Sequence, residues 1–251
     1  MKVNRCLILA AGNGSRLRPV SSGLPKPLVP FRGRPILEHV ILRAQQARIN
    51  EFVIVVGYRS DLIRRWCDSR WLGDVSVTFV ENPEYHKQNG MSALKARNEL
   101  RDNFLLVMAD HLFEPETARA LMRQPLAPGE VILGVDPKID DVFDLDDATK
   151  VRREGELIVD IGKEIRSYDA LDTGMFLCSP ALFDSLESVV RDGDCSLSDG
   201  MRQLARARRL RGLEIGAAQW QDVDTPEALE YAEHSFDRPL SRPEVGTLAS
   251  V

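Results

Sequence analysis

The segment over residues 7–28 combines a glycine-rich turn with basic side chains in the order LILAAGNGSRLRPVSSGLPKPL. Gly12 and Gly14 let the backbone approach an anion closely and point N–H groups at it. Arg16 offers a planar fork of donors and Lys26 a compact charge, and both neutralise phosphate oxygens. The segment therefore predicts a site for a phosphorylated ligand, with contacts from Leu9, Ala10, Ala11, Gly12, Asn13, Gly14 and Ser15.

This loop differs from two widespread phosphate-binding loops. No Gly-Lys-Ser or Gly-Lys-Thr follows the glycines, so it is not a Walker loop. Leu17 stands where the dinucleotide fingerprint needs its third glycine, which disfavours a hydride-transfer enzyme. A turn with solvated basic residues would explain Gly-x-Gly alone, but the added Arg16 and Lys26 favour phosphate binding.

Three aspartates are candidates for metal binding. Asp110 directly follows an apolar run, and Asp222 and Asp224 occupy alternate positions of an expected strand, so their side chains point to the same side. Carboxylate oxygens are the ligands that Mg²⁺ prefers. We therefore predict Mg²⁺ as the cofactor, held by Asp110 and by one or both of the pair. One of the pair would otherwise cap the helix that begins near Thr225.

Metal carboxylates beside basic side chains suit transfer reactions between two anions. A bound metal ion and nearby cations lower the repulsion between the reactants and stabilise the transition state electrostatically. No Ser/His/Asp or Cys/His arrangement stands out in the sequence. The chemistry expected here needs no covalent enzyme intermediate.

In the first half of the chain, short apolar runs alternate with helical patterns, which is typical of βαβ units. A helix that starts near Pro35 has apolar residues on one stripe and would pack on a sheet. Open α/β sheets bind ligands beyond the carboxyl ends of their strands, so the loop and Asp110 are expected at one sheet edge. The predicted fold class is α/β, a Rossmann-like mixed, mostly parallel sheet flanked by helices. Its first strands are expected over 6–11, 52–56, 75–80, 104–109 and 131–135.

The pattern changes after about residue 135. An acidic stretch precedes a predicted hairpin, with strands over 150–153 and 156–161 and a turn at Glu154-Gly155. We interpret about 136–172 as a small accessory β lobe. A strand over 173–178 and helices near 180–190, 196–207 and 225–233 complete a domain over 1–234, and 235–251 is expected to be a C-terminal tail or linker.

Composition excludes several classes of protein. The net charge of −5 argues against a general affinity for nucleic acid or for anionic membranes. The four cysteines lie far apart without a CxxC pair, which predicts neither a zinc site nor a disulfide framework and favours the reducing cytoplasm. No apolar run is long enough to predict a membrane span.

Residues 7–28 resemble the nucleotidyltransferase superfamily that makes nucleotide-sugars and CDP-alcohols, whose pattern is Leu-Ala-Ala-Gly-x-Gly-x-Arg-Leu followed by Pro-Lys-Pro. Among its subfamilies, the cytidylyltransferases that activate inositol 1-phosphate are similar over almost the whole chain, to about Glu233. The resemblance implies CTP and a small phosphorylated polyol, inositol 1-phosphate, as substrates and CDP-inositol as product. The further strings are NPEYHKQNGMSALKA, MADHLFEPE, DTGMFLCSPALF, DCSLSDGMRQLA and WQDVDTPEALEYAE.

The resemblance also implies roles for individual residues. Relatives have a second metal aspartate in the segment of Asp222 and Asp224, and the Asp-Thr-Pro string gives a slight preference for Asp224. Arg16 would hold the departing pyrophosphate, and Lys26 would stabilise charge around the reacting phosphate. The groups that could hydrogen-bond the base and ribose are the side chains of Asn82, Asn89 and Ser92 and the backbone of Gly90. The acceptor, with Lys163 at its phosphate, would contact His111, Asp136, Asp144, Lys163, Asp172, Thr173 and Gly174. Plainer explanations are turns and caps for the asparagines, packing for the histidine, and solvated surface for the acidic residues.

Two other functions stay open. In the first, the chain catalyses the same transfer to phosphocholine, a phosphonate or a sugar 1-phosphate. The aromatic residues are scattered along the chain, which disfavours the aromatic cage that a choline headgroup usually needs. In the other, the chain is a non-catalytic nucleotide-sensing protein, although Arg16, Lys26, Asp110 and Asp224 are all retained. The bifunctional relatives continue into membrane helices that use CDP-inositol, so a membrane CDP-alcohol phosphotransferase is the expected downstream partner. The oligomeric state is left open.

Overall fold

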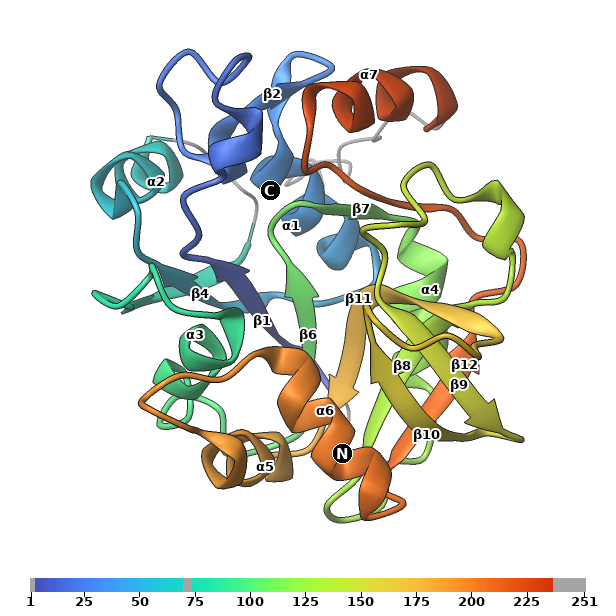
Figure 1. The fold of residues 1–251 in the computed structure, drawn as a ribbon. Coiled ribbons are helices and arrows are strands. Elements are labelled where there is room, and N and C mark those ends of the chain that lie inside the picture. The colour runs from blue at the N-terminus through green and yellow to red at the C-terminus, as the bar shows by residue number, and fades with distance from the viewer. Residues whose placement is uncertain (1–2, 70–73, 237–251) are drawn as a thin grey trace, which may run out of the picture.

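A nine-stranded mixed sheet runs through the molecule in the order β5-β4-β1-β6-β11-β8-β12-β10-β9 (Figure 1). The structure is a computed structural model that describes residues 3–69 and 74–236. The strands are β1 (Arg5–Ala10), β4 (Glu51–Val56), β5 (Ser76–Glu81), β6 (Phe104–Met108), β8 (Val131–Asp136), β9 (Lys150–Glu154), β10 (Leu157–Gly162), β11 (Ala170–Cys178) and β12 (Leu210–Glu214).

The first half of the sheet is parallel, as the alternation of apolar runs and helical patterns predicts. Strands β5, β4, β1 and β6 pair in parallel, and Cys6 of β1 lies between Phe52 and Leu105. Side chains of β1 alternate between two buried cores, with Ile8 in one and Leu7 in the other. A strand buried on both faces explains the unbroken apolar run that ends in the glycine turn.

The second half departs from the predicted mostly parallel arrangement. Strand β11 is antiparallel to both β6 and β8, and only β12 pairs in parallel, with β8. Over the whole sheet, five of nine pairings are antiparallel. The prediction of a mixed sheet is confirmed, but "mostly parallel" is wrong, because an apolar strand carries no signal of its direction.

The predicted hairpin exists as β9 and β10, but it belongs to the main sheet. Strand β10 pairs with β12, and β9 pairs with the start of β11. The strands β11, β8, β12, β10 and β9 thereby form a closed ring of pairings. The segment predicted as an accessory lobe, about 136–172, is therefore continuous with the core.

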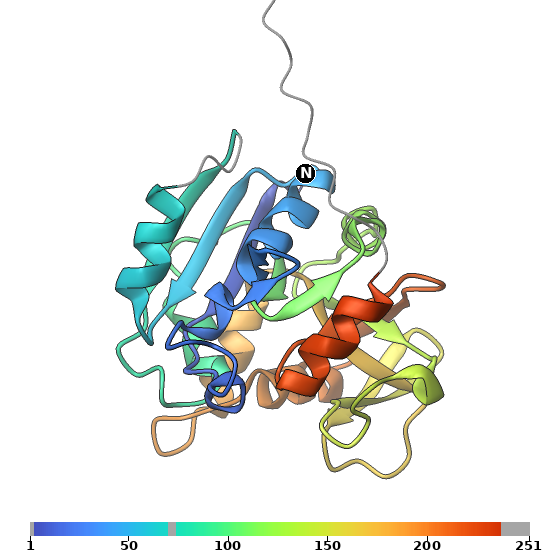
Figure 2. The same ribbon diagram turned by 90° about the horizontal axis from the view of Figure 1, so that it is seen from above.

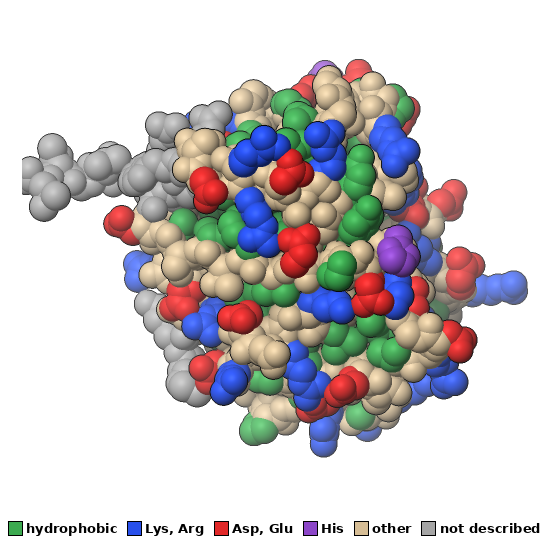
Figure 3. Space-filling view, turned by 90° about the vertical axis from the view of Figure 1, so that its left-hand side faces the viewer, with side chains coloured by type: hydrophobic (Ala, Val, Ile, Leu, Met, Phe, Trp, Pro, Cys, Tyr) green, Lys and Arg blue, Asp and Glu red, His purple; other side chains and the backbone are tan. Residues whose placement is uncertain are grey.

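Helices cover both faces of the sheet. The buried core on one face includes residues of α1 (Ile36–Gln46), α2 (Ser60–Asp68) and α4 (Pro115–Met122), and the core on the other face includes residues of α3 (Asn89–Lys95), α5 (Ala181–Val189) and α6 (Leu197–Arg206). Figure 2 shows α2 and the last helix, α7 (Pro226–Ser235), on opposite sides of the view. The face around α2 shows interspersed basic and acidic side chains (Figure 3), without a continuous basic surface.

Two short sheets and three 3-10 turns complete the described chain, and the sequence patterns did not predict them. The sheets pair β2 (Pro30–Phe31) with β3 (Arg34–Pro35), and β7 (His111–Phe113) with β13 (Trp220–Asp222). The turns are η1 (Ser15–Leu17), η2 (Lys26–Leu28) and η3 (Ile139–Asp141).

The end of the domain lies slightly beyond the predicted boundary at residue 234. Helix α7 continues through Ser235, and Phe236 is only 3% exposed because its ring packs against the guanidinium of Arg43. The rest of the predicted tail, 237–251, lies outside the described residues. Among the helices described, none has the length and apolar character that crossing a membrane requires.

Candidate active site

The pairing of β7 with β13 brings distant carboxylates together. Asp222 lies opposite His111 in the register, and the backbone N–H of Val223 donates to the carbonyl of Asp110 over 3.0 Å. One ligand atom each from Asp110, His111 and Asp222 lies within 4.8 Å of the other two. Two residues more than 100 positions apart in the chain thus become neighbours because two three-residue strands pair.

Lys26 lies at the centre of this carboxylate cluster. Its side chain is 8% exposed, and its Nζ lies 2.5 Å from an oxygen of Asp110 and 3.6 Å from Oδ1 of Asp222. It also forms an ion pair with Asp224. A buried ammonium is tolerated only where anions compensate for its lost hydration, and three aspartates do so here.

The cluster shifts the pKa values of its members. Burial alone would raise the pKa of Asp110, but Lys26 and His111 outweigh it and hold that pKa well below the usual range. Burial raises the pKa of Asp222. Burial would lower the pKa of His111, but Asp222 and Asp110 raise it to about 9, and Nδ1 of His111 donates to Asp110 over 2.8 Å.

The residues present fit a divalent metal ion. Oδ1 of Asp222 is buried and has no hydrogen-bond partner in the described part of the chain. The cationic groups near it, Nζ of Lys26 at 3.6 Å and Nδ1 of His111 at 3.8 Å, are too far away to hydrogen-bond it, which is costly for a buried carboxylate oxygen. Hard oxygen donors from Asp110 and Asp222 match the preference of Mg²⁺. Asp224 is engaged by both Lys26 and Arg16. The geometry therefore favours Asp222 over the Asp224 that the sequence slightly preferred.

The two glycines of the glycine-rich loop have different structural roles. Gly14 has φ of +55°, and a Cβ added to it would lie 2.4 Å from Cβ of Lys26. Glycine is thus required for Lys26 to approach the loop. A Cβ on Gly12 would meet nothing within 4 Å. The space in front of Gly12 belongs to a cavity of about 350 Å³, whose loop residues are Leu9, Ala10, Gly12, Asn13, Gly14, Ser15 and Arg16.

Ala11 is the one predicted loop residue that does not line this cavity. Its side chain is buried in the sheet core, and its carbonyl accepts from the N–H of Tyr58 over 3.0 Å. Its role is to anchor the loop. The cavity is completed by residues that the prediction did not select, in particular Tyr85, His86 and Lys87. Their position in the segment after β5, beside the predicted base-binding residues, was the available signal.

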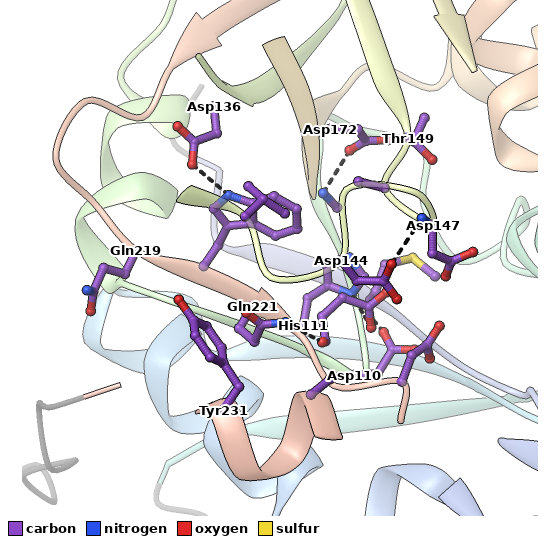
Figure 4. A pocket seen from close by; sticks show the side chains of 18 of the residues that line it. Asp110, His111, Asp136, Asp144, Asp147, Thr149, Asp172, Gln219, Gln221 and Tyr231 are labelled. Carbon is purple, nitrogen blue, oxygen red and sulfur yellow. Dashed lines mark hydrogen bonds and ion pairs between the residues drawn. The ribbon is translucent and has the colours of Figure 1, made fainter. Parts of the chain in front are cut away.

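A second cavity of about 900 Å³, some of whose lining side chains Figure 4 shows, adjoins the first at the carboxylate cluster. Both cavities are lined by Asp110 and Asp224, while Asp222 and His111 line only the larger one. Two ligands can therefore bind on opposite sides of the same carboxylates. The larger cavity also contains these residues predicted to contact an acceptor: His111, Asp136, Asp144, Lys163, Asp172 and Gly174.

Thr173 faces away from the larger cavity, and Asp136 is hydrogen-bonded within the protein. The hydroxyl of Thr173 is buried and donates to the carbonyl of Gly134 over 2.8 Å, so Thr173 does not face the cavity. Both oxygens of Asp136 are occupied, one by the indole N–H of Trp220 at 2.9 Å and one by Lys138 at 2.7 Å. Asp136 lines the cavity but mainly holds Trp220 in place.

Asp172 and Gly174 line the larger cavity near His111. Oδ1 of Asp172 accepts from the N–H of Gly174 over 2.7 Å, and burial raises the pKa of Asp172 to about 6. Gly174 has φ of +72°, and an added Cβ would lie 2.3 Å from Cδ2 of His111. The imidazole is stacked on Trp220, with ring centroids 6.1 Å apart. Gly174 is therefore needed to seat His111 rather than to bind a ligand by itself.

The predicted base-binding residues mostly hold the fold together. The amide of Asn82 donates to the hydroxyl of Ser92 over 2.9 Å, both are buried, and neither lines either of the two cavities described above. A Cβ on Gly90 would lie 2.6 Å from the carbonyl of Cys195, so Gly90 permits close packing near the start of α6. Direct contacts from these three residues to a base are not supported. Asn89 lines the larger cavity and accepts from the N–H of Leu197 over 2.8 Å.

Comparisons with known proteins show the family of this chain. Residues 6–210 match the family described as MobA-like NTP transferase domain. A relative named Bifunctional IPC transferase and DIPP synthase, from Rubrobacter xylanophilus, is 37% identical over 246 residues, which cover 94% of this chain and 54% of that protein. The solved structure of the inositol-1-phosphate CTP transferase from T. maritima has a TM-score of 0.83 at 25% identity and covers 96% of this chain and 99% of that one.

A UDP-glucose pyrophosphorylase complexed with UDP-glucose has a TM-score of 0.80 at 17% identity, over 93% of this chain and 98% of that one, and shows the likeness of the fold alone. The chain spans about half the length of the curated relatives it matches. The family match includes the phosphate loop, Lys26 and Asp110. The predicted superfamily is confirmed, and this chain belongs to the family of MobA-like NTP transferase domains.

Proposed function

We propose that this nucleotidyltransferase transfers CMP from CTP to inositol 1-phosphate, which yields CDP-inositol and pyrophosphate. The observation that carries the proposal is the meeting of two cavities at one cluster of carboxylates around a buried lysine. Support for the substrates comes from the T. maritima structure and from the R. xylanophilus relative, whose names specify an inositol-1-phosphate CTP transferase and an IPC transferase.

The nucleotide would bind with its phosphates in the smaller cavity. Backbone N–H groups of residues 12–14 would meet the phosphates, since no Cβ on Gly12 blocks the space in front of them, whereas the N–H of Ser15 donates to Oδ1 of Asn13. Arg16 lies at the same cavity, and Lys87 extends the positive lining. Charge-assisted hydrogen bonds from these groups would neutralise the triphosphate and later the pyrophosphate that leaves.

The acceptor would bind in the larger cavity with its phosphate toward the carboxylate cluster. Lys163 is the cation proposed for that phosphate, and Asp144 and Asp172 face the same space as acceptors for ring hydroxyls. An oxygen of the acceptor phosphate then attacks the α-phosphorus in line, and the bond to pyrophosphate breaks. Lys26, which lies at the boundary of the two cavities, reduces the repulsion between the two anions.

Asp110 and Asp222 are the residues we propose to hold Mg²⁺. When bound, the ion would screen the phosphate oxygens and stabilise the charge that develops during transfer. Nδ1 of His111 donates to Asp110 and keeps that carboxylate oriented. Neither residue forms a covalent intermediate in this scheme.

A pyrophosphate-release screen tests the proposed substrates. Each of the four NTPs is combined with inositol 1-phosphate, glucose 1-phosphate, phosphocholine or aminoethylphosphonate, with and without Mg²⁺. The proposal predicts release only with CTP, inositol 1-phosphate and Mg²⁺ together. Turnover restricted to UTP or dTTP with a sugar phosphate would sink the inositol assignment, and CTP binding without turnover for any acceptor would favour the nucleotide-sensing function.

The place of the reaction is also inferred. All four cysteines are free and buried, which supports work in a reducing compartment, and we propose the cytoplasm. A CDP-activated polyol is a donor for enzymes that transfer the phosphorylated polyol to another alcohol with release of CMP. We propose a membrane enzyme of that class as the partner that consumes the product.

Substituting Gly12 with alanine should separate ligand binding from folding. The added methyl group meets no protein atom within 4 Å but enters the nucleotide cavity, so KM for CTP should rise about tenfold while the melting temperature stays unchanged. Gly14→Ala is the matched variant, and it should lower the melting temperature because it clashes with Lys26 at positive φ. Steady-state kinetics and thermal unfolding check both. Equal KM values for wild type and Gly12→Ala would contradict binding of the CTP phosphates in this cavity.

A further inference from the structure

One carboxylate links the cations of the two cavities. Asp147 lies between η3 and β9, and Oδ2 of Asp147 accepts from Arg16 over 2.8 Å. Its other oxygen, Oδ1, pairs with Lys163. Arg16 lines the smaller cavity and Lys163 lines the larger one. Asp147 therefore spans the boundary between the proposed nucleotide and acceptor sites.

The segment that carries Asp147 is attached at two further points. Phe143 is stacked on Tyr231 of α7, with ring centroids 4.8 Å apart. Nζ of Lys150 donates to the backbone carbonyl of Asp146 over 2.9 Å. Both contacts leave the Asp147 side chain free to point at the two cations, and Figure 4 shows Asp147 beside Asp144 at the cavity.

Asp147 is ionised at neutral pH. Burial alone would raise its pKa, but Lys163 and Arg16 lower it to about 2. An ionised carboxylate and a phosphate both bind guanidinium and ammonium groups, and they repel each other. A phosphate at Arg16 or Lys163 therefore competes with Asp147 for that cation, and at Arg16 it also competes with Asp224.

We propose that Asp147 is a positioning residue that holds Arg16 and Lys163 in the ligand-free enzyme and releases them to the substrate phosphates. Held in this way, the two cations are kept at the boundary without a ligand. Asp147 also competes with phosphates for these two cations, so it weakens the binding of a phosphate to the ligand-free protein. The competition itself follows from the ion pairs, whereas the assignment of Lys163 to the acceptor phosphate rests on the proposed function.

Binding of inorganic pyrophosphate to the ligand-free protein tests the competition. Isothermal titration is carried out in EDTA at fixed ionic strength, so that no metal ion contributes. Asp147→Asn should bind pyrophosphate about threefold to tenfold more tightly than wild type, the range that two partly exposed ion pairs allow. Asp146→Asn is the matched control, since the neighbouring exposed side chain has the same charge, and it should bind pyrophosphate like wild type. Asp147→Glu should restore the weaker wild-type binding.

A second set of variants tests the same competition even if Asp147→Asn alters the conformation of the segment between η3 and β9. In the background of Arg16→Gln, the gain from Asp147→Asn should shrink, because the cation of the smaller cavity that Asp147 holds is already gone. With substrates, Asp147→Asn should lower KM for the acceptor more than it changes kcat. Unchanged or weaker pyrophosphate binding by Asp147→Asn, or equal gains in both backgrounds, would overturn the proposal. An enzyme inactive with CTP and inositol 1-phosphate would instead contradict the proposed function and leave the binding result standing.

Discussion

Asp110→Asn is expected to abolish nucleotidyl transfer while the protein stays folded. The amide keeps the shape of the side chain but removes the negative charge that we propose to hold Mg²⁺ beside Asp222. Turnover should fall at least about 1,000-fold, which corresponds to roughly 4 kcal/mol of lost transition-state stabilisation. Asp222 and Asp224 remain to pair with Lys26, so the fold should tolerate the change. Pyrophosphate release and circular dichroism measure the two effects.

Asp102→Asn provides a matched control. Asp102 precedes the opposite end of the same strand, β6, and its side chain is exposed. It makes the same change in net charge and should keep wild-type turnover. Near-normal activity of Asp110→Asn, with added Mg²⁺ at the concentration that saturates wild type, would refute the metal role of Asp110.

Lys26→Met is expected to reduce both turnover and stability. Without the ammonium, the three carboxylates around it lose their shared partner while they remain close together. Removing one partner of a buried ion pair costs about 3–5 kcal/mol of unfolding free energy. Turnover should fall about 100- to 1,000-fold, because Lys26 lies at the boundary where the two anions meet. Urea unfolding and steady-state kinetics measure the two losses.

Mg²⁺ should partly restore the stability of Lys26→Met. A divalent cation among the unpaired carboxylates replaces the missing charge, so Mg²⁺ should raise the unfolding free energy of the variant more than that of wild type. Lys150→Met is the control, since Lys150 is also 8% exposed but donates to the backbone carbonyl of Asp146. It should show no such rescue. Equal Mg²⁺ effects on all three proteins would contradict a metal site at this cluster.

The positions of the residues that end strands could be predicted from the sequence. Gly12 and Asp110 each follow an apolar run, and the carboxyl ends of parallel strands meet at one edge of a sheet. Lys26 was found for a different reason, because the Pro-Lys-Pro string is a family pattern. Its burial among three aspartates could not be predicted, since it depends on the path of residues 18–25 between the loop and η2.

The sequence pattern could not decide which of Asp222 and Asp224 is the second metal ligand. Side chains alternate between the two faces of a strand, so the sequence predicted that Asp222 and Asp224 lie on the same face. This periodicity cannot show which of the two lies closer to Asp110. The pairing of β13 with β7 then sets Asp222 opposite His111, while Asp224 lies two residues past that point and pairs with Arg16. Strands of three residues have too little sequence to predict such a register.

Asn82 and Ser92 were overinterpreted for a related reason. Both have side chains that can hydrogen-bond a base, and the sequence cannot show that they hydrogen-bond each other across the intervening loop. Asp147 was missed for the opposite reason. It is one of many acidic residues between 136 and 147, and its contacts with Arg16, 131 positions away, and with Lys163 distinguish it.

The fate of labelled phosphate in CTP tests the central claim most directly. The enzyme is incubated with Mg²⁺, inositol 1-phosphate and CTP labelled at either the α- or the γ-phosphate, and the products are separated. Attack on the α-phosphorus predicts that the α label appears in CDP-inositol and the γ label in pyrophosphate, in equal amounts. Label from the γ position in a doubly phosphorylated inositol, or α label found only in CMP, would contradict nucleotidyl transfer at this site.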